Sequence, residues 1–138
     1  MLRAVLFSLL LAFAGCADPQ QARIQRSAAA DDIQIESPEP GARIASPLRA
    51  SGVADNRWYF EAVFPARLMA QDGAIIAEAP AIAASDWTRP GPVPFNVEMA
   101  FTVDEETPAT LVLEEDMPSG EPPERHVRIP VVLLPEPQ

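Results

Sequence analysis

Three consecutive acidic residues, Glu114, Glu115 and Asp116, are the side chains of this sequence best suited to bind a metal ion. The turn-forming segment Ser119–Glu121 follows them closely. Calcium is bound by several carboxylate and carbonyl oxygens from a flexible loop, so we treat these three acids as a candidate calcium site. The spacing lacks the alternating Asp/Asn ladder of an EF-hand. The alternative is a solvated strand end whose charges protect a sheet edge from pairing.

Residue types for nucleophilic or general acid–base catalysis are scarce. His126 is the only histidine and Cys16 the only cysteine, which argues against a catalytic triad and against a zinc site built from His and Cys. Twenty acidic residues make chance carboxylate pairs inevitable, and nothing marks one of them as buried. His126 falls opposite the apolar face of a strand and is expected to face solvent. We expect no enzymatic activity and no catalytic residues.

Aromatic residues offer a second kind of site, either a sugar-binding platform or a contact for a protein partner. Alternation along a strand places Trp58 and Phe60 on one side and Tyr59 on the other, so we expect Trp58 and Phe60 in the core. Trp87 lies in a long proline-rich loop over residues 85–94. An aromatic side chain there either plugs one end of the fold or serves as an anchor for a partner.

The first sixteen residues resemble a lipoprotein leader. Arg3 precedes an apolar run from Ala4 to Ala14, which is too short to span a bilayer, and Phe13-Ala14-Gly15-Cys16 is similar to the lipobox of bacterial lipoproteins. In that motif the cysteine is acylated and becomes the new N-terminus. The rival interpretation is ordinary cleavage after Ala14, which leaves Cys16 as a free thiol. We expect residues 1–15 to be removed and Cys16 to be lipidated.

The charge balance narrows the set of partners. The chain has 10 Lys+Arg, all of them arginine, against 20 Asp+Glu, a formal net charge of −10. This acidity argues against nucleic acid and against binding of anionic lipid head groups, since both need positive charge. With one cysteine, no intramolecular disulfide can form, so core packing alone must hold the domain.

Beyond the leader, the sequence pattern is that of an all-β sandwich. Residues 16–32 have no sustained apolar period and are interpreted as the lipidated N-terminus and a flexible tether, and residues 135–138 as a disordered tail. Residues 33–134 consist of short apolar runs separated by Pro, Gly, Asp and Ser, and frequent prolines argue against helices. We expect seven strands, over residues 33–35, 48–54, 58–69, 75–83, 95–103, 109–113 and 127–133.

Three local features position the candidate residues within these strands. Pro65 interrupts the strand over residues 58–69 and implies an edge or a bulge. Asp72-Gly73 predicts a tight hairpin turn, because both residues accept positive φ. Glu61 and Glu114 are expected to pair with Arg67 or with another arginine across the sheets, as an exposed pair of small energy.

Several motifs in order resemble the immunoglobulin-like domain of bacterial spore germination proteins. The motifs are Ser37-Pro38-Glu39-Pro40-Gly41, Ile44, Ser46-Pro47-Leu48, Ser51-Gly52, Trp58-Tyr59-Phe60-Glu61, Arg67-Leu68, Asp72-Gly73, Trp87, Pro94-Phe95, Leu111-Val112-Leu113-Glu114, Asp116, Pro118-Ser119-Gly120 and Ile129-Pro130-Val131. The likeness covers roughly residues 33–134. It implies an antiparallel immunoglobulin-like β-sandwich that is exported and non-catalytic. Met117 departs from the polar residue that is more usual there.

We therefore expect a lipid-anchored protein of the cell envelope whose immunoglobulin-like domain is a protein-binding or assembly module without a cofactor. Its partners would be the membrane, through the N-terminal lipid, and an envelope protein, but no nucleic acid. The candidate contact residues are Trp87, Met117, Pro118, Ser119 and Gly120. Ala17 after the cysteine favours the periplasmic side of an outer membrane in a cell with two membranes. The alternative is a module that binds calcium or a glycan.

Overall fold

The computed structural model describes residues 23–138, so the leader and Cys16 lie outside the described residues. The described part of the chain is almost entirely β-structure with one short 3-10 helix. The elements are β1 (Gln25–Arg26), β2 (Ile33–Ser37), β3 (Ala42–Ile44), β4 (Leu48–Asp55), η1 (Asn56–Trp58), β5 (Val63–Ala70), β6 (Ile75–Ala83), β7 (Pro92–Met99), β8 (Thr107–Glu114) and β9 (His126–Leu133). All seven expected strands are present in some form, and β1 and β3 are additional.

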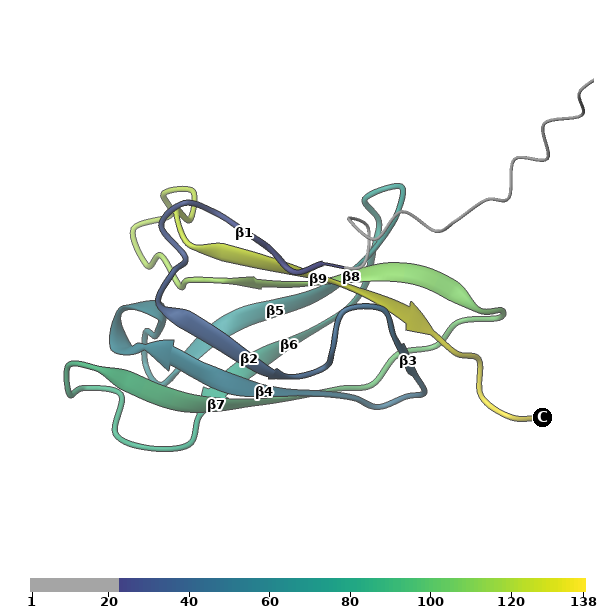
Figure 1. Ribbon diagram of the computed structural model, residues 1–138, viewed down its shortest axis with the longest axis horizontal. Coiled ribbons are helices and arrows are strands. Elements are labelled where there is room, and N and C mark those ends of the chain that lie inside the picture. Colours follow the sequence, from purple (N-terminus) through teal and green to yellow (C-terminus); the bar gives the residue numbers. More distant parts are fainter. Residues whose placement is uncertain (1–22) are drawn as a thin grey trace, which may run out of the picture.

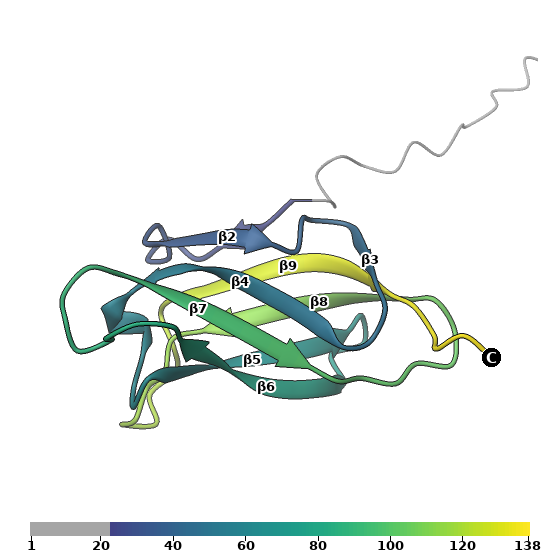
Figure 2. The same cartoon turned by 90° about the horizontal axis from the view of Figure 1, so that it is seen from below.

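The strands form one curled, nine-stranded sheet that folds into two layers (Figures 1 and 2). β2, β4 and β7 make one layer, and β9, β8, β5 and β6 make the other. β6 joins the layers, because it pairs with β5 over most of its length and with β7 only at Ile82 and Ala83. All pairings are antiparallel except that of β3 with β9. The predicted all-β, immunoglobulin-like antiparallel sandwich is confirmed.

The core lies between the two layers and follows the alternation of the sequence. In β7, Val93, Phe95, Val97 and Met99 are buried while the residues between them are exposed, and β9 repeats the pattern. Inward side chains at alternate positions of facing sheets are what a sandwich core requires. Phe64 of β5 packs edge-to-face on Phe95, at 5.1 Å between ring centroids, and on Trp58, at 5.5 Å. These rings fill the core near one end of the sandwich.

The region expected as a single strand over residues 58–69 is different in the structure. Trp58 ends η1, and a two-residue turn separates Phe60 from Val63, the first residue of β5. Trp58 and Tyr59 are both buried where η1 ends, so the strand alternation is interrupted before the turn, and Phe60 is 42% exposed. The expectation that Trp58 lies in the core is confirmed, and the expectation for Phe60 is wrong. Periodicity cannot register a turn that contains neither Gly nor Pro.

Pro65 and the hairpin over residues 71–74 behave as expected. Pro65 pairs with Pro80 of β6, whereas the pairing of β5 with β8 starts only at Ala66, so Pro65 has an unpaired outer side. Proline is tolerated at such edge positions because it has no N–H to donate. In the hairpin, Gly73 has a φ of +88°, and the Asp72 carboxylate accepts a hydrogen bond from the backbone N–H of Ala74.

The second half of the expected tether is part of the folded domain. β1 pairs with the start of β9, and Ala30 is fully buried. The Asp32 side chain then contacts η1 and the β8–β9 loop. The expected start of the domain at Ile33 is therefore too late, because β1 pairs with the edge of β9 and Asp32 binds Trp58 and Arg57. The tail residues 135–138 are exposed, and no helix among the described residues is long and apolar enough to cross a membrane.

Candidate interaction site at one end of the sandwich

Four connecting segments meet at the same end of the sandwich. They are residues 27–32, 56–62, 84–91 and 115–125, and we call this end the loop end (at the left in Figure 1). The antiparallel topology brings them together, because each joins strands at the end where β4, β6 and β8 finish. The C-terminus lies at the opposite end (Figure 1). The loop of Trp87 and the turn of Met117–Gly120, far apart in sequence, thus belong to one end.

The Trp87 loop is exposed around a partly buried anchor. The Trp87 side chain packs against the edge of the core, whereas Ser85, Asp86, Thr88 and Arg89 are exposed. The Asp86 carboxylate accepts a hydrogen bond of 3.0 Å from the backbone N–H of Thr88, which fixes the loop beside the tryptophan. Trp87 therefore plugs the end of the sandwich and presents only part of its ring to solvent.

The turn over Met117–Gly120 projects from the same end. The backbone N–H of Gly120 donates to the carbonyl of Met117 at 2.9 Å, and Gly120 has a φ of +77°, which glycine adopts without strain. Pro118, Ser119 and Gly120 are exposed, and Met117 is partly buried. The turn therefore exposes backbone and small side chains at the surface.

A network of charged side chains connects residues 27–32, 56–62 and 115–125, three of the four segments at this end. Asp32 lies at its centre and accepts a hydrogen bond of 2.8 Å from the indole Nε1–H of the buried Trp58. Its second oxygen lies 3.0 Å from Arg57 Nη2 and 3.3 Å from Arg125 Nε. Arg57 also pairs with Asp55, at 2.7 Å. We call these residues, with Glu115, the charge network.

Glu115 closes the charge network on the side of the β8–β9 loop. Its carboxylate, 4% exposed, accepts hydrogen bonds from the backbone N–H groups of Glu124 and Arg125 and from Arg125 Nη1 at 2.9 Å. Burial alone raises the pKa of Glu115, but the bonds from Arg125 and Glu124 outweigh burial and place the pKa below its usual value. Glu115 is thus a charged anchor, held by three donors.

The three candidate calcium ligands point to different partners. Glu114 Oε2 lies 2.6 Å from Arg67 Nη1, one of the arginine pairings expected for this acid, while Glu115 is bound by Arg125. Among residues 23–138, no group of three or more His, Cys, Asp or Glu is arranged to hold a metal ion. Two of the three acids are thus paired with an arginine, which supplies the positive charge that a metal ion would otherwise supply.

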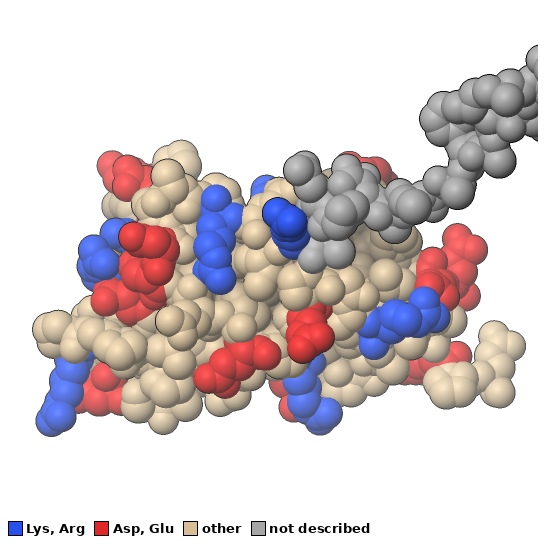
Figure 3. Space-filling model, viewed as in Figure 1, with Lys and Arg blue, Asp and Glu red and all other residues tan. Residues whose placement is uncertain are grey.

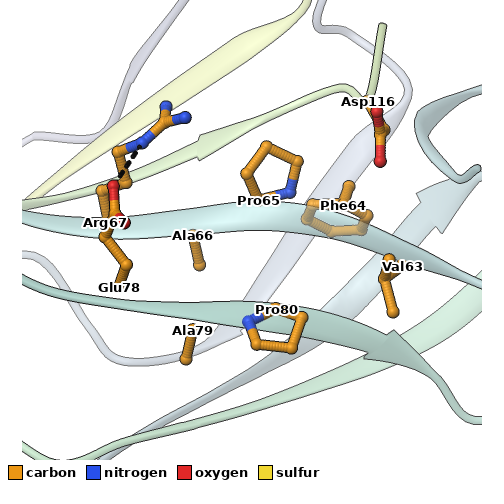
Figure 4. Close-up of a pocket in the computed structure, with 9 residues that line it drawn as sticks. All are labelled: Val63, Phe64, Pro65, Ala66, Arg67, Glu78, Ala79, Pro80 and Asp116. Atoms are coloured by element: carbon orange, nitrogen blue, oxygen red, sulfur yellow. Dashed lines mark hydrogen bonds and ion pairs between the residues drawn. The ribbon is translucent and has the colours of Figure 1, made fainter. Parts of the chain in front are cut away.

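A groove of about 520 Å³ opens on the outer face of β5 and β6, next to the loop end (Figure 4). Pro65 and Pro80, directly paired across the two strands, form its floor, and Val63 lies toward the loop end. Figure 4 shows the Arg67–Glu78 ion pair at one end of the groove and Asp116 toward the other. We call this feature the proline groove.

A family model for the immunoglobulin-like domain of bacterial spore germination matches residues 32–121. The chain belongs to this family. The match begins at Asp32 of the charge network and ends in the β8–β9 loop, and β9 completes the sandwich beyond it. No curated protein and no solved structure matches the chain.

Membership in the immunoglobulin-like family indicates a non-enzymatic module, since such domains are typically non-catalytic. The candidate site residues of this immunoglobulin-like domain fall into two groups. Trp87 and Met117–Gly120, which the sequence suggested, belong to two loops at the loop end. Asp32, Arg57 and Arg125, which the sequence did not indicate, connect residues 27–32, 56–62 and 115–125. Asp32 and Arg125 are 93 positions apart, so no local pattern could have linked them.

The proline groove was also missed. Pro65 was recognised as an edge signal, but Pro80 gave no indication that it would face Pro65. The register between β5 and β6 is set by the hairpin at Asp72–Gly73, and counting outward from that turn is the one signal that could have found the pair. A bulge at Leu68/Met69 shifts the count by one residue.

Proposed function

We propose that this immunoglobulin-like domain is a non-catalytic protein-binding module of the cell envelope, anchored to a membrane through a lipid on Cys16. The observation that supports binding is the construction of the loop end. Three of its four segments, residues 27–32, 56–62 and 115–125, are joined by a charge network of ion pairs between 2.7 and 3.3 Å. The fourth, the Trp87 loop, is held by the packing of Trp87 on the core and by the hydrogen bond from the backbone N–H of Asn56 to the carbonyl of Gly91. A preorganised surface binds partners at lower entropic cost than a mobile one.

The electrostatics support a protein partner and not nucleic acid. The chain has a net charge of −10, and six arginines among the described residues form ion pairs with acids of the chain. On the face seen in Figure 3, acidic and basic side chains are interspersed and form no continuous basic surface. Nucleic-acid binding depends on clustered positive charge.

The sequence before β1 supports the anchor. Eight residues separate Cys16 from Gln25, and a fully extended chain covers at most roughly 3.5 Å per residue. The lipid would therefore hold the domain within roughly 30 Å of the membrane surface. In a cell with two membranes, Ala17 after the cysteine favours the outer membrane, with the domain in the periplasm.

Crosslinking tests the binding function. The full-length, natively processed protein is crosslinked in its own cells, and the proteins that co-purify are compared between wild type and Trp87→Ala. The matched control is Val103→Ala, since Val103 is also partly buried against the core but lies in the loop after β7 at the opposite end. We expect one envelope protein to be captured by wild type and Val103→Ala, and lost in Trp87→Ala.

A second variant keeps this test independent of folding. Ser119→Arg adds a bulky charge to the exposed turn without touching the core. We expect it to lower capture of the same protein while the melting temperature stays at the wild-type value. Equal capture by all variants would contradict a binding role for the loop end.

The anchor has its own experiment. Cys16→Ala should abolish both the acyl mass on the mature N-terminus and partition into the detergent phase, because two acyl chains are what makes such an anchor stable. A wild-type protein without acyl mass would show that the lipid anchor is wrong, and the interaction module would then act as a secreted protein.

A further inference from the structure

The outer face of β5 and β6 displays apolar side chains in a regular arrangement next to the loop end. Val63 pairs with Ile82 across the strands and with Phe60 across the turn, so these three side chains form one row on the same face. Pro65 and Pro80 form the next row, which is the floor of the proline groove. Phe60 and Ile82, 42% and 53% exposed, are two of the three most exposed large apolar side chains among the described residues.

The backbone that presents Phe60 is strained. Glu61 and Ala62 connect Phe60 to Val63 with φ values of 49° and 69°, in the left-handed region that L-residues other than Asn and Asp seldom occupy. Backbone hydrogen bonds of 3.0 and 3.2 Å between Phe60 and Val63 close the turn. Strain of this kind clusters at functional sites, where it fixes the position of a side chain.

The rim of the groove is acidic. Glu78 and Asp116 line it with two negative charges, and Arg67 supplies one positive charge. Glu114 lies outside the lining but adds a third negative charge next to it, as an ion-pair partner of Arg67. Arg67 is already paired with Glu78 at 3.1 Å and with Glu114 at 2.6 Å. The local balance of −2 leaves negative potential over an apolar floor. A membrane with anionic head groups, or a second copy of this face, would bring like charges together.

We infer that the proline groove binds a segment of the partner protein that carries a large apolar or aromatic side chain flanked by Lys or Arg. The apolar side chain lies on Pro65 and Pro80 beside Val63, and the flanking cations face Glu78 and Asp116. Ile82, the cross-strand partner of Val63, extends the apolar contact surface beyond the groove. The volume of about 520 Å³ is within the range of sites that enclose a small ligand or a single anchoring side chain. This inference rests on the proposed protein-binding function and specifies the chemistry of the partner.

A peptide titration tests the groove directly. The probe is the acetylated peptide Gly-Lys-Trp-Lys-Gly, added to the detergent-solubilised, isotope-labelled full-length protein and followed by amide chemical shifts in NMR spectra. The comparison peptides are Gly-Glu-Trp-Glu-Gly, with the charge reversed, and Gly-Lys-Ala-Lys-Gly, without the aromatic ring. We expect shifts confined to the segments 60–67 and 78–82 with the first peptide, and binding at least about tenfold weaker with the other two.

Two pairs of variants locate the contact. Ile82→Ala should weaken binding about tenfold, while Ile75→Ala, at the far end of the same strand and 54% exposed, should leave it unchanged. Glu78→Gln should weaken binding and reduce its salt dependence. Glu98→Gln should have no effect, since Glu98 is an exposed acid of β7 that pairs with Arg49 of β4.

The outcomes separate this inference from the proposed function. Equal affinity for the three peptides, or equal loss in Ile75→Ala and Ile82→Ala, overturns the groove as a basic-segment site. A partner that is lost in Trp87→Ala but retained in Ile82→Ala leaves the binding module intact and overturns the groove alone. Self-association on the groove face, detected as a dimer that Ile82→Ala dissolves, also overturns it.

Discussion

Glu115 is the most buried charged residue of the loop end, and its ionisation should determine how the protein responds to acid. Because hydrogen bonds to the carboxylate outweigh burial, the folded-state pKa of Glu115 lies below the ordinary value of 4.5. A depressed pKa gives stabilisation that is complete above the unfolded-state value and is lost as the pH falls through the lower folded-state value. The free energy of unfolding should therefore decrease as the pH is lowered below about 4.5.

Substitution isolates the contribution of this carboxylate. At pH 7, Glu115→Ala should lower the free energy of unfolding by about 2–3 kcal/mol, because it leaves Arg125 Nη1 and two backbone N–H groups without their acceptor. Glu115→Gln should flatten the acid dependence. Urea titrations between pH 7 and pH 3 measure both effects. Glu98→Gln, which alters an exposed pair, should retain the wild-type slope, and a wild-type slope in Glu115→Gln would refute the assignment.

Individual side chains were predictable where the strand pattern was regular. Glu114 was expected to pair with Arg67 or another arginine, and Trp58 was expected in the core. Tyr59 is buried and Phe60 is exposed, the reverse of what was expected, because the end of η1 and the turn at Glu61–Ala62 interrupt the strand alternation. The roles of Asp32 and Arg125 depend on contacts between distant segments, which composition and periodicity do not encode.

At the scale of elements, the turn that joins Phe60 to Val63 has an unfavourable sequence for its geometry. Two-residue hairpin turns with positive φ at both central residues favour Asn-Gly, and each L-residue held in that region costs about 1 kcal/mol or more. The double variant Glu61→Asn/Ala62→Gly should therefore raise the free energy of unfolding by about 1–2 kcal/mol.

A glycine introduced elsewhere provides the control. Ala84→Gly changes an exposed residue of the Trp87 loop that has no positive φ, so it should lower stability by about 0.5–1 kcal/mol through the added freedom of the unfolded chain. Chemical denaturation measures all three proteins. If the double variant is also destabilised, the turn does not store the strain that its φ values indicate.

Gly52 sets the spacing of the layer formed by β2, β4 and β7. A Cβ added at this position would lie 2.1 Å from the carbonyl oxygen of Gln34 and 3.0 Å from the ring of Phe95. Because the first contact is with backbone, Gly52→Ala must displace β2 or β4, and it should cost about 2–3 kcal/mol. Ser51→Ala, the adjacent half-exposed position, should change stability by less than about 0.5 kcal/mol. Equal melting temperatures for the two variants would contradict this close approach.

The elements themselves were largely readable from the sequence, since long alternating runs such as Phe95–Met99 can satisfy both a buried and an exposed face only as strands. The two strands that were missed, β1 and β3, have two and three residues. Both exist because they pair with β9, and such short strands have no periodicity of their own. Tertiary pairing, and not local preference, defines them.

For the whole molecule, the N-terminal segment determines both where the domain begins and how far it stands from its anchor. Residues 23–32 were expected to be tether, yet β1 covers the edge of β9 and Arg26 Nη1 donates to the carbonyl of Ile33 at 2.6 Å. An uncovered strand edge promotes association between chains, so β1 and β3 together protect β9. The tether available to a lipid on Cys16 is correspondingly shorter than the sequence suggested.

A shortened chain that begins at Ile33 should be much less stable than one that begins at Arg23. It lacks β1, the buried Ala30 and, above all, Asp32, whose loss leaves the indole N–H of Trp58 and Arg57 Nη2 without their shared acceptor and removes the ion pair with Arg125. A buried donor without a partner costs about 1–3 kcal/mol, and loss of the edge strand adds to this, so we expect a difference of about 3 kcal/mol or more by urea denaturation.

Removal of the exposed residues 135–138 is the matched control and should leave the midpoint unchanged. Asp32→Asn in the longer chain should reproduce part of the loss, and equal stability of the chains that begin at Arg23 and Ile33 would return residues 23–32 to the tether.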